Sequence, residues 1–264
     1  MEENRISRLR PAQVIERMAR SPVVYIPIGP IEWHGPHLPF GVDPLNAEDV
    51  SIRTCAVTGG MVWPTLFWGT ERERRPEQLE ALGLPRESYV VGMDFPANSL
   101  PSAYCPEEIF GLVVRELLRE VRLMGARVAV IVNGHGAVNH NQVLRRLAAE
   151  SNQASGLRVH VRMAMPMDEV ERGAIGHATS TETSIMMNID RSSVAVDALP
   201  AFPTPLRFEE FGIVDGLGFD GKGDPGRVVQ EDPRTLSSPE AGREVSERTV
   251  RELAEQVRGI LGAL

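Results

Sequence analysis

Cysteine and aromatic residues are scarce in this chain of 264 residues. It has two cysteines, Cys55 and Cys105, and only 5% of its residues are aromatic. Two cysteines exclude the disulfide framework of a small secreted protein and are typical of a reducing cytoplasm. No apolar run approaches the roughly 20 residues that a membrane-spanning helix needs, and the N-terminal residues lack the apolar core of a signal peptide. We therefore expect a cytoplasmic protein without a membrane partner.

An excess of positive charge is also absent. Lysine and arginine number 28 against 36 aspartates and glutamates, which gives a net charge of −8. This balance argues against a nucleic-acid partner, because such partners attract basic surfaces. Hydrophobic residues make up 42% of the chain and charged residues 24%, the proportions of an ordinary globular protein with a sizeable core. At about 150 residues per domain, the length alone allows one or two domains.

Apolar runs alternate with segments of helical periodicity along the chain. The runs over 23–28, 61–68, 127–132 and 157–163 predict strands, the second of them interrupted by Pro64. Helices are predicted over 11–20, 44–57, 106–124, from the end of the loop 133–140 to residue 150, over 181–189 and over 239–261. Strands that alternate with helices predict an α/β fold, a three-layer sandwich with a mostly parallel central sheet and helices on both faces. The irregular segments 69–105 and 200–235 are expected to be long surface loops.

Histidines and carboxylates gather directly after two of the predicted strands. His34 follows the first strand together with Glu32 and Asp43, and His135 follows the strand 127–132. In parallel sheets, ligands bind beyond the carboxyl ends of the strands. Imidazole and carboxylate together suit Zn, Mn, Fe or Co, whereas a thiolate site would need cysteines that the chain lacks. Hydrogen-bonded loop residues are the alternative interpretation, but the recurrence of the pattern after two strands favours a metal site.

Three motifs identify a family resemblance. The segment 29–39, GPIEWHGPHLP, resembles the G-S-x-E-Q-H-G-P-H-L-P signature of the creatininase (creatinine amidohydrolase) family. The segment 133–136, NGHG, resembles its second signature, N-G-H-G-G-N, and 177–184, HATSTETS, resembles its third, H-A-G-E-x-E-T-S. Because motifs that span 29–184 have to converge on one site, we expect a single domain over residues 1–264.

The resemblance implies a dinuclear metal hydrolase on a compact α/β fold, assembled as a homo-oligomer, in this family a hexamer. Carried over by position, Glu32 and His135 would bind one metal ion and His34 the other, with Asp43 bridging the two. Creatininase has a further glutamate ligand two residues after the second-motif histidine. This sequence has Ala137 there.

Glu182 is the candidate to replace that missing ligand. Glu32, Asp43 and Glu182 with one bridging hydroxide would then balance the charge of two divalent ions. A single ion would leave excess negative charge in the cleft, which is costly unless the carboxylates take up protons. We therefore expect two divalent ions per subunit, Zn, Mn or Fe.

The expected chemistry is hydrolysis by a metal-activated hydroxide. A divalent metal lowers the pKa of its bound water toward about 7, and the resulting hydroxide attacks a carbonyl carbon. His177 matches the family histidine that acts as the proton shuttle to the leaving group. The alternative is that His177 only orients a turn.

The substrate remains open among several small molecules. The family resembled here hydrolyses creatinine, a formamidopyrimidine, a peptide in mycofactocin maturation and a C–C bond of a dehydro-inosose. Trp33, in place of the family's usual Gln, and Ala137 both count against creatinine. The first hypothesis is a hydrolase of a small cyclic or linear amide. Its rivals are a C–C hydrolase of a cyclic polyol ketone and a catalytically silent oligomeric binding protein.

Other conspicuous side chains receive structural roles. His37 is expected to brace the ligand loop, and Trp63 and Trp68 to lie in the core. The charged, arginine-rich stretch 71–75 is expected to lie on a surface exposed to solvent. The alternative is that its arginines bind an anionic substrate.

Overall fold

The computed structural model describes residues 3–81, 84–95, 100–154, 156–171, 176–206, 208–209, 212–213 and 232–263. Its longer elements are α1 (Pro11–Arg20), β1 (Val23–Ile28), α2 (Val42–Thr58), β2 (Met61–Val62), α4 (Glu107–Leu123), β3 (Val128–Asn133), α5 (Val138–Gln153), β4 (Arg158–Met163), α7 (Ser180–Ile189) and α10 (Pro239–Gly262). Short elements are η1 (Ile6–Arg8), α3 (Pro76–Ala81), α6 (Met167–Glu171), η2 (Arg191–Ser193), η3 (Val196–Ala198), β5 (Phe208–Glu209), β6 (Gly212–Ile213) and α9 (Pro233–Leu236).

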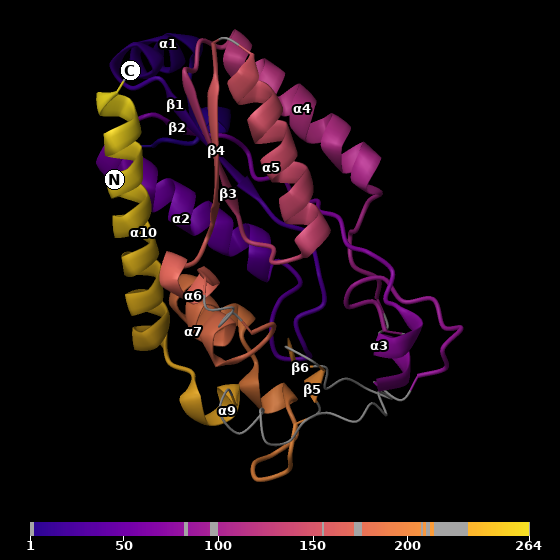
Figure 1. Ribbon diagram of the computed structural model, residues 1–264. Coiled ribbons are helices and arrows are strands. Elements are labelled where there is room, and N and C mark those ends of the chain that lie inside the picture. Colours follow the sequence, from indigo (N-terminus) through magenta and orange to yellow (C-terminus); the bar gives the residue numbers. More distant parts are fainter. Residues whose placement is uncertain are drawn as a thin grey trace.

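A parallel sheet with the strand order β2-β1-β3-β4 forms the centre of the fold. Strands β1 and β3 pair in register from Val23 with Val128 to Ile28 with Asn133, and both are buried along their whole length. Their sequences are continuous apolar runs because both faces of the sheet are covered. Helices α4 and α5 lie on one side and α2 and α10 on the other (Figure 1). The predicted α/β sandwich is confirmed.

Two hydrophobic cores fill the space between the sheet and its helices. Alternate strand residues such as Ile26 and Ile131 face α1, α4 and α5, where Phe110 is fully buried. The intervening residues, Tyr25 and Val130 among them, face α2 and α10. This alternation follows from the period of two in a strand, which sends successive side chains to opposite faces of the sheet.

The second predicted strand is shorter than expected. Instead of running over 61–68, β2 ends at Val62, and beyond it only an isolated bridge joins Leu66 to Ile28. Pro64 lies in between and cannot donate a backbone hydrogen bond. The expectation that Trp68 lies in the core is wrong, because the residue is 47% exposed, whereas Trp63 packs against the first core.

The two segments expected to be loops contain some regular structure. Within 69–105 the chain forms α3 and two isolated bridges, Gly69 with Tyr104 and Glu73 with Val91. Within 200–235, β5 pairs antiparallel with β6 and α9 begins, while much of that segment lies outside the described residues. Across the described ranges, no helix combines the length and apolarity needed to cross a lipid bilayer.

The strand order determines where a ligand can bind. The chain places β2 on one side of β1 and β3 on the other, so the connections leave β1 and β3 toward opposite faces of the sheet. A crevice opens beyond the carboxyl ends of two such strands. Here these ends are Ile28 and Asn133, which are directly paired.

Candidate metal centre

The loop after β1 and the start of α2 supply three of the predicted ligands. Glu32 and His34 lie in the loop, and both side chains are buried. Asp43, expected in that loop, lies instead in the first turn of α2, which begins at Val42. Pro44 is accommodated there because the N–H groups of a first turn have no helical acceptor. The positive end of the helix dipole also favours the buried carboxylate of Asp43.

The loop after β3 brings His135 against Asp43. Gly134 packs so tightly on the backbone of Asp43 that a Cβ atom would collide with the carbonyl oxygen. This close approach puts the next residue beside the carboxylates: His135 Nδ1 lies 3.0 Å from Asp43 Oδ2 and 3.2 Å from Glu32 Oε2. Glu32, Asp43 and His135 thus form one group of ligand atoms that could share a metal ion.

A second group forms around the other oxygen of Asp43. His34 Nε2 lies 3.3 Å from Asp43 Oδ1 and 3.8 Å from Glu182 Oε2. Glu182 reaches this place from the first turn of α7, where the backbone N–H of Ala178 donates to Oε2 at 2.5 Å. The two carboxylate oxygens of Asp43 therefore face different histidines, which is the arrangement expected of a residue that bridges two ions.

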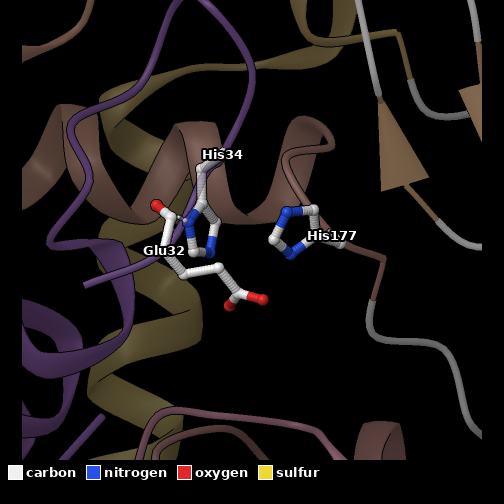
Figure 2. A group of neighbouring side chains, drawn as sticks. All are labelled: Glu32, His34 and His177. Carbon is white, nitrogen blue, oxygen red and sulfur yellow. Dashed lines mark hydrogen bonds between the residues drawn. The ribbon is translucent and has the colours of Figure 1, made fainter. Parts of the chain in front are cut away.

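Hydrogen bonds to backbone carbonyls fix the tautomers of two imidazoles. His34 Nδ1 lies 3.0 Å from the carbonyl oxygen of Glu32, and His177 Nε2 lies 2.6 Å from that of Trp33. Since a carbonyl only accepts, each of these nitrogens carries the hydrogen, and the lone pair of the neutral ring lies on the other nitrogen. The carboxylate of Glu32 and the rings of His34 and His177 turn toward one another (Figure 2), with the two ring centroids 4.2 Å apart.

The buried charges of the site stabilise one another. Burial disfavours an imidazolium, but the carboxylates of Glu182 and Asp43 outweigh it and raise the pKa of His34 to about 10. Burial likewise opposes ionisation of Asp43, yet the adjacent His34 and His135 lower its pKa well below the usual value. Burial raises the pKa of Glu182 to about 7. Burial also lowers the pKa of His177 to about 4, so this ring is neutral at physiological pH.

The donor set fits divalent metal ions. The nitrogens that face the carboxylates are His34 Nε2 and His135 Nδ1, and of these two His34 Nε2 is buried without a hydrogen-bond partner among the described residues. Three carboxylates stand beside these two imidazoles, so the buried group has more acidic than basic side chains, an excess that divalent cations would neutralise. Nitrogen and carboxylate oxygen are the ligands of Zn, Mn and Fe sites, and no thiolate is needed.

Polar residues around this group hold its loops. His37 Nε2 lies 3.0 Å from Thr183 Oγ1, which links the ligand loop to α7. The Asn133 side chain accepts from the backbone N–H of His135 at 3.0 Å and donates to its carbonyl at 2.7 Å. His140, buried in α5, stands 3.1 Å from Asn133 Oδ1 through Nε2. The first of these contacts agrees with the bracing role expected of His37, and the others hold the loop after β3 against α5.

The structure adds Tyr104, which sequence reasoning missed. Its hydroxyl donates a short hydrogen bond to Glu32 Oε1. The residue lies in the irregular segment 69–105, outside the three motifs, and no periodicity or spacing marks it. In the stretch 71–75, Arg72, Glu73 and Arg75 are exposed, as expected of a surface exposed to solvent, and Arg72 pairs with Glu107. Arg74 is the exception, because it is buried and donates to the carbonyl of Gly92.

Comparisons with known proteins agree with the motifs. The sequence profile of the creatininase family, described as creatinine amidohydrolase, matches residues 7–257. The chain is 28% identical over 181 residues to the mycofactocin precursor peptide peptidase of Mycolicibacterium smegmatis. That match covers 67% of this chain and 62% of the relative, so the chain spans slightly less than two thirds of the relative's length.

Solved creatininase structures have the same fold. A creatinine amidohydrolase (creatininase) aligns with a TM-score of 0.67 at 22% identity, over 99% of both chains. A creatininase described as the Mn form aligns with a TM-score of 0.66 at 23% identity, over 98% of this chain and 99% of the other. At these identities the likeness shows a shared fold. With the family profile matching nearly the whole sequence, the chain belongs to the creatininase family of creatinine amidohydrolases.

Proposed function

We propose that this protein is a metal-dependent amidohydrolase with two divalent metal ions, Zn, Mn or Fe, in each subunit. Glu32 and His135 would hold one ion, His34 and Glu182 the other, and Asp43 would bridge them. The observation that carries this proposal is the orientation of Asp43, whose Oδ1 lies 3.3 Å from His34 and whose Oδ2 lies 3.0 Å from His135. Membership in a family of amidohydrolases supports the same conclusion.

The residues around the site would divide the work of hydrolysis. When bound, two divalent ions supply an activated water at neutral pH and polarise the carbonyl that is attacked. His177 holds its Nε2 hydrogen against the Trp33 carbonyl, which leaves Nδ1 to take up a proton and pass it to the leaving nitrogen. Glu182 is anchored by the N–H of Ala178, so its carboxylate is positioned before a metal ion arrives.

We propose a small cyclic or linear amide as the substrate. A second candidate is an amide bond within a peptide, which the likeness to a precursor peptide peptidase favours. A screen of the metal-reconstituted enzyme against lactams, formamides, short peptides and cyclic ketones separates these candidates from C–C hydrolysis. His177→Ala is the control. A variant that keeps full activity would remove His177 from the mechanism.

Metal analysis tests the two-ion site directly. The wild-type protein should bind two equivalents of Zn²⁺ or Mn²⁺, Asp43→Ala should lose both, and Glu182→Gln should retain one. Glu116→Gln, which changes an exposed carboxylate of α4, is the matched control and should retain two. Two full equivalents in Asp43→Ala would refute the bridging role. If the wild-type protein has no affinity for either metal, the hypothesis of a catalytically silent binding protein would be favoured over that of a metal-dependent enzyme.

We further propose that residues 1–264 form one domain and that the protein is a homo-oligomer, a hexamer by family, in a reducing cytoplasm. The two free cysteines, Cys55 and Cys105, are compatible with that setting. Light scattering combined with size-exclusion chromatography would measure the mass of the assembly, and a mass of 29.0 kDa, that of one chain, would refute the oligomer.

A further inference from the structure

Tyr104 is the one described side chain outside the family motifs that donates a hydrogen bond to a proposed ligand carboxylate. Its hydroxyl contacts Glu32 Oε1. A carboxylate oxygen only accepts, so the phenol is the donor in this contact. Nothing in the proposed chemistry uses this group. Its role therefore has to come from what it does to Glu32.

The two oxygens of Glu32 are committed to different neighbours. Oε1 accepts from Tyr104, and Oε2 lies 3.2 Å from His135 Nδ1, within the group of atoms that could share an ion. A carboxylate can bind a metal through one oxygen or through both. An O–H donor on Oε1 occupies that oxygen, so a bound ion would be held through Oε2.

The surrounding backbone holds the Tyr104 hydroxyl in place. Tyr104 forms a bridge with Gly69, and the N–H of Cys105 donates to the carbonyl of Gly69 at 2.9 Å. The N–H of Met93 donates to the Tyr104 hydroxyl oxygen at 3.3 Å. A Cβ atom on Gly92 would collide with that hydroxyl, so this turn passes directly against it. The phenol is therefore fixed from two sides before it reaches Glu32.

We propose that Tyr104 is a positioning residue that holds Glu32 as a one-oxygen ligand by occupying Oε1. The proposal rests on the proposed function, because Glu32 is a ligand only if the site binds metal. Hydrogen-bonded partners of ligands typically change metal affinity by about 10- to 100-fold when they are removed. Tyr104→Phe removes the donor and keeps the ring.

Titration of the metal-free protein with Co²⁺, followed by visible absorption, tests this role. In Tyr104→Phe the affinity for the equivalent bound at Glu32 should fall about 10- to 100-fold. The absorption per bound Co²⁺ should also weaken, because the freed oxygen can join the coordination and raise the ligand number. Tyr89→Phe changes a tyrosine that is 75% exposed and should match the wild type. An unchanged spectrum in Tyr104→Phe overturns the proposal, whether or not the affinity or the stability changes.

A measurement without metal separates this proposal from the proposed function. Tyr104→Phe, Glu32→Gln and the double variant form a cycle for the free energy of unfolding of the metal-free protein. Non-additive effects are expected, because the two side chains share a hydrogen bond. If the wild type binds no Co²⁺, the metal function fails, and the cycle then decides whether Tyr104 orients Glu32 at all. Additive effects overturn the positioning role in either case.

Discussion

Loading the site with metal at neutral pH should release protons. In the metal-free protein the pKa of His34 is about 10, and that of His135 is also raised well above its ordinary value. Both imidazoles are therefore protonated at pH 7. The pKa of Glu182 is about 7, so this carboxyl is about half protonated there. A metal ion binds imidazole nitrogen and carboxylate oxygen only after these protons have left.

The size of the release follows from these pKa values. Filling both positions at pH 7 should displace about two to three protons per chain, and a bound water that ionises would add about one more. Deprotonating His34 three pH units below its pKa of about 10 costs about 4 kcal/mol, at about 1.4 kcal/mol per unit. The apparent affinity should therefore rise about tenfold per pH unit for each displaced proton, and stop rising above the pKa of that group.

Calorimetric titration with Zn²⁺ in buffers of different ionisation enthalpy measures the number of protons directly. Glu182→Gln is an internal control: it should keep only the ion at Glu32 and His135, so the release at pH 7 should fall by about one and a half protons, one from His34 and half from Glu182. A release of less than one proton per chain would refute the reasoning. It would mean that His34 and His135 are already neutral in the metal-free protein while the carboxylates beside them are already ionised, so that the site holds few protons to lose.

Three further measurements concern stability. In the metal-free protein the pKa of His34 is about 10, against about 6.5 in the unfolded chain, so protonated His34 stabilises the fold fully below pH 6.5. The melting temperature of the metal-free protein should therefore fall as the pH rises from 6.5 toward 10. The metal-loaded protein should not show this fall. Gly134→Ala should destabilise by about 1–3 kcal/mol in denaturant unfolding, because the new methyl group collides with the backbone of α2, whereas Gly136→Ala, with open space around it, should stay within about 0.5 kcal/mol. Gly242→Ala should lower the melting temperature, because the new methyl group would force α10 away from a backbone carbonyl of α7. Gly259→Ala has open space around it on the same helix and should raise the free energy of unfolding by about 0.5–1 kcal/mol, because alanine favours a helix over glycine. Equal effects within either glycine pair would contradict the packing described here.

The sequence predicted the parts of the fold that depend on burial. The run 23–28 and β1 coincide, and β3 and β4 each differ from their predicted bounds by one residue. Strands buried on both faces leave a continuous apolar signature, which is read easily. The run 61–68 is equally apolar, but Pro64 and the exposed Trp68 show that apolar character alone does not extend a strand.

The candidate site was predictable only where motifs mark it. Five of the six candidates lie in the three motifs: Glu32, His34, His135, His177 and Glu182. Asp43 follows the first motif by four residues, and the structure brings all six together. The contact of Tyr104 with Glu32 spans 72 positions and depends on how an irregular segment returns to the sheet. No local sequence pattern predicts how this segment comes back to the sheet, so the contact could be found only in the structure.

The bridge between Gly69 and Tyr104 has a consequence for engineering. Exchanging the segment that it closes, 70–103, is one way to alter the surroundings of the site. Its two ends also supply the hydroxyl on Glu32 and the N–H of Thr70 that donates to His140 at 3.3 Å. A graft that moves either end would disturb the contacts that hold the metal site. Loop exchanges should therefore be cut inside the bridge and should keep Gly69, Thr70 and Tyr104, together with the turn at Gly92 and Met93 that contacts the Tyr104 hydroxyl.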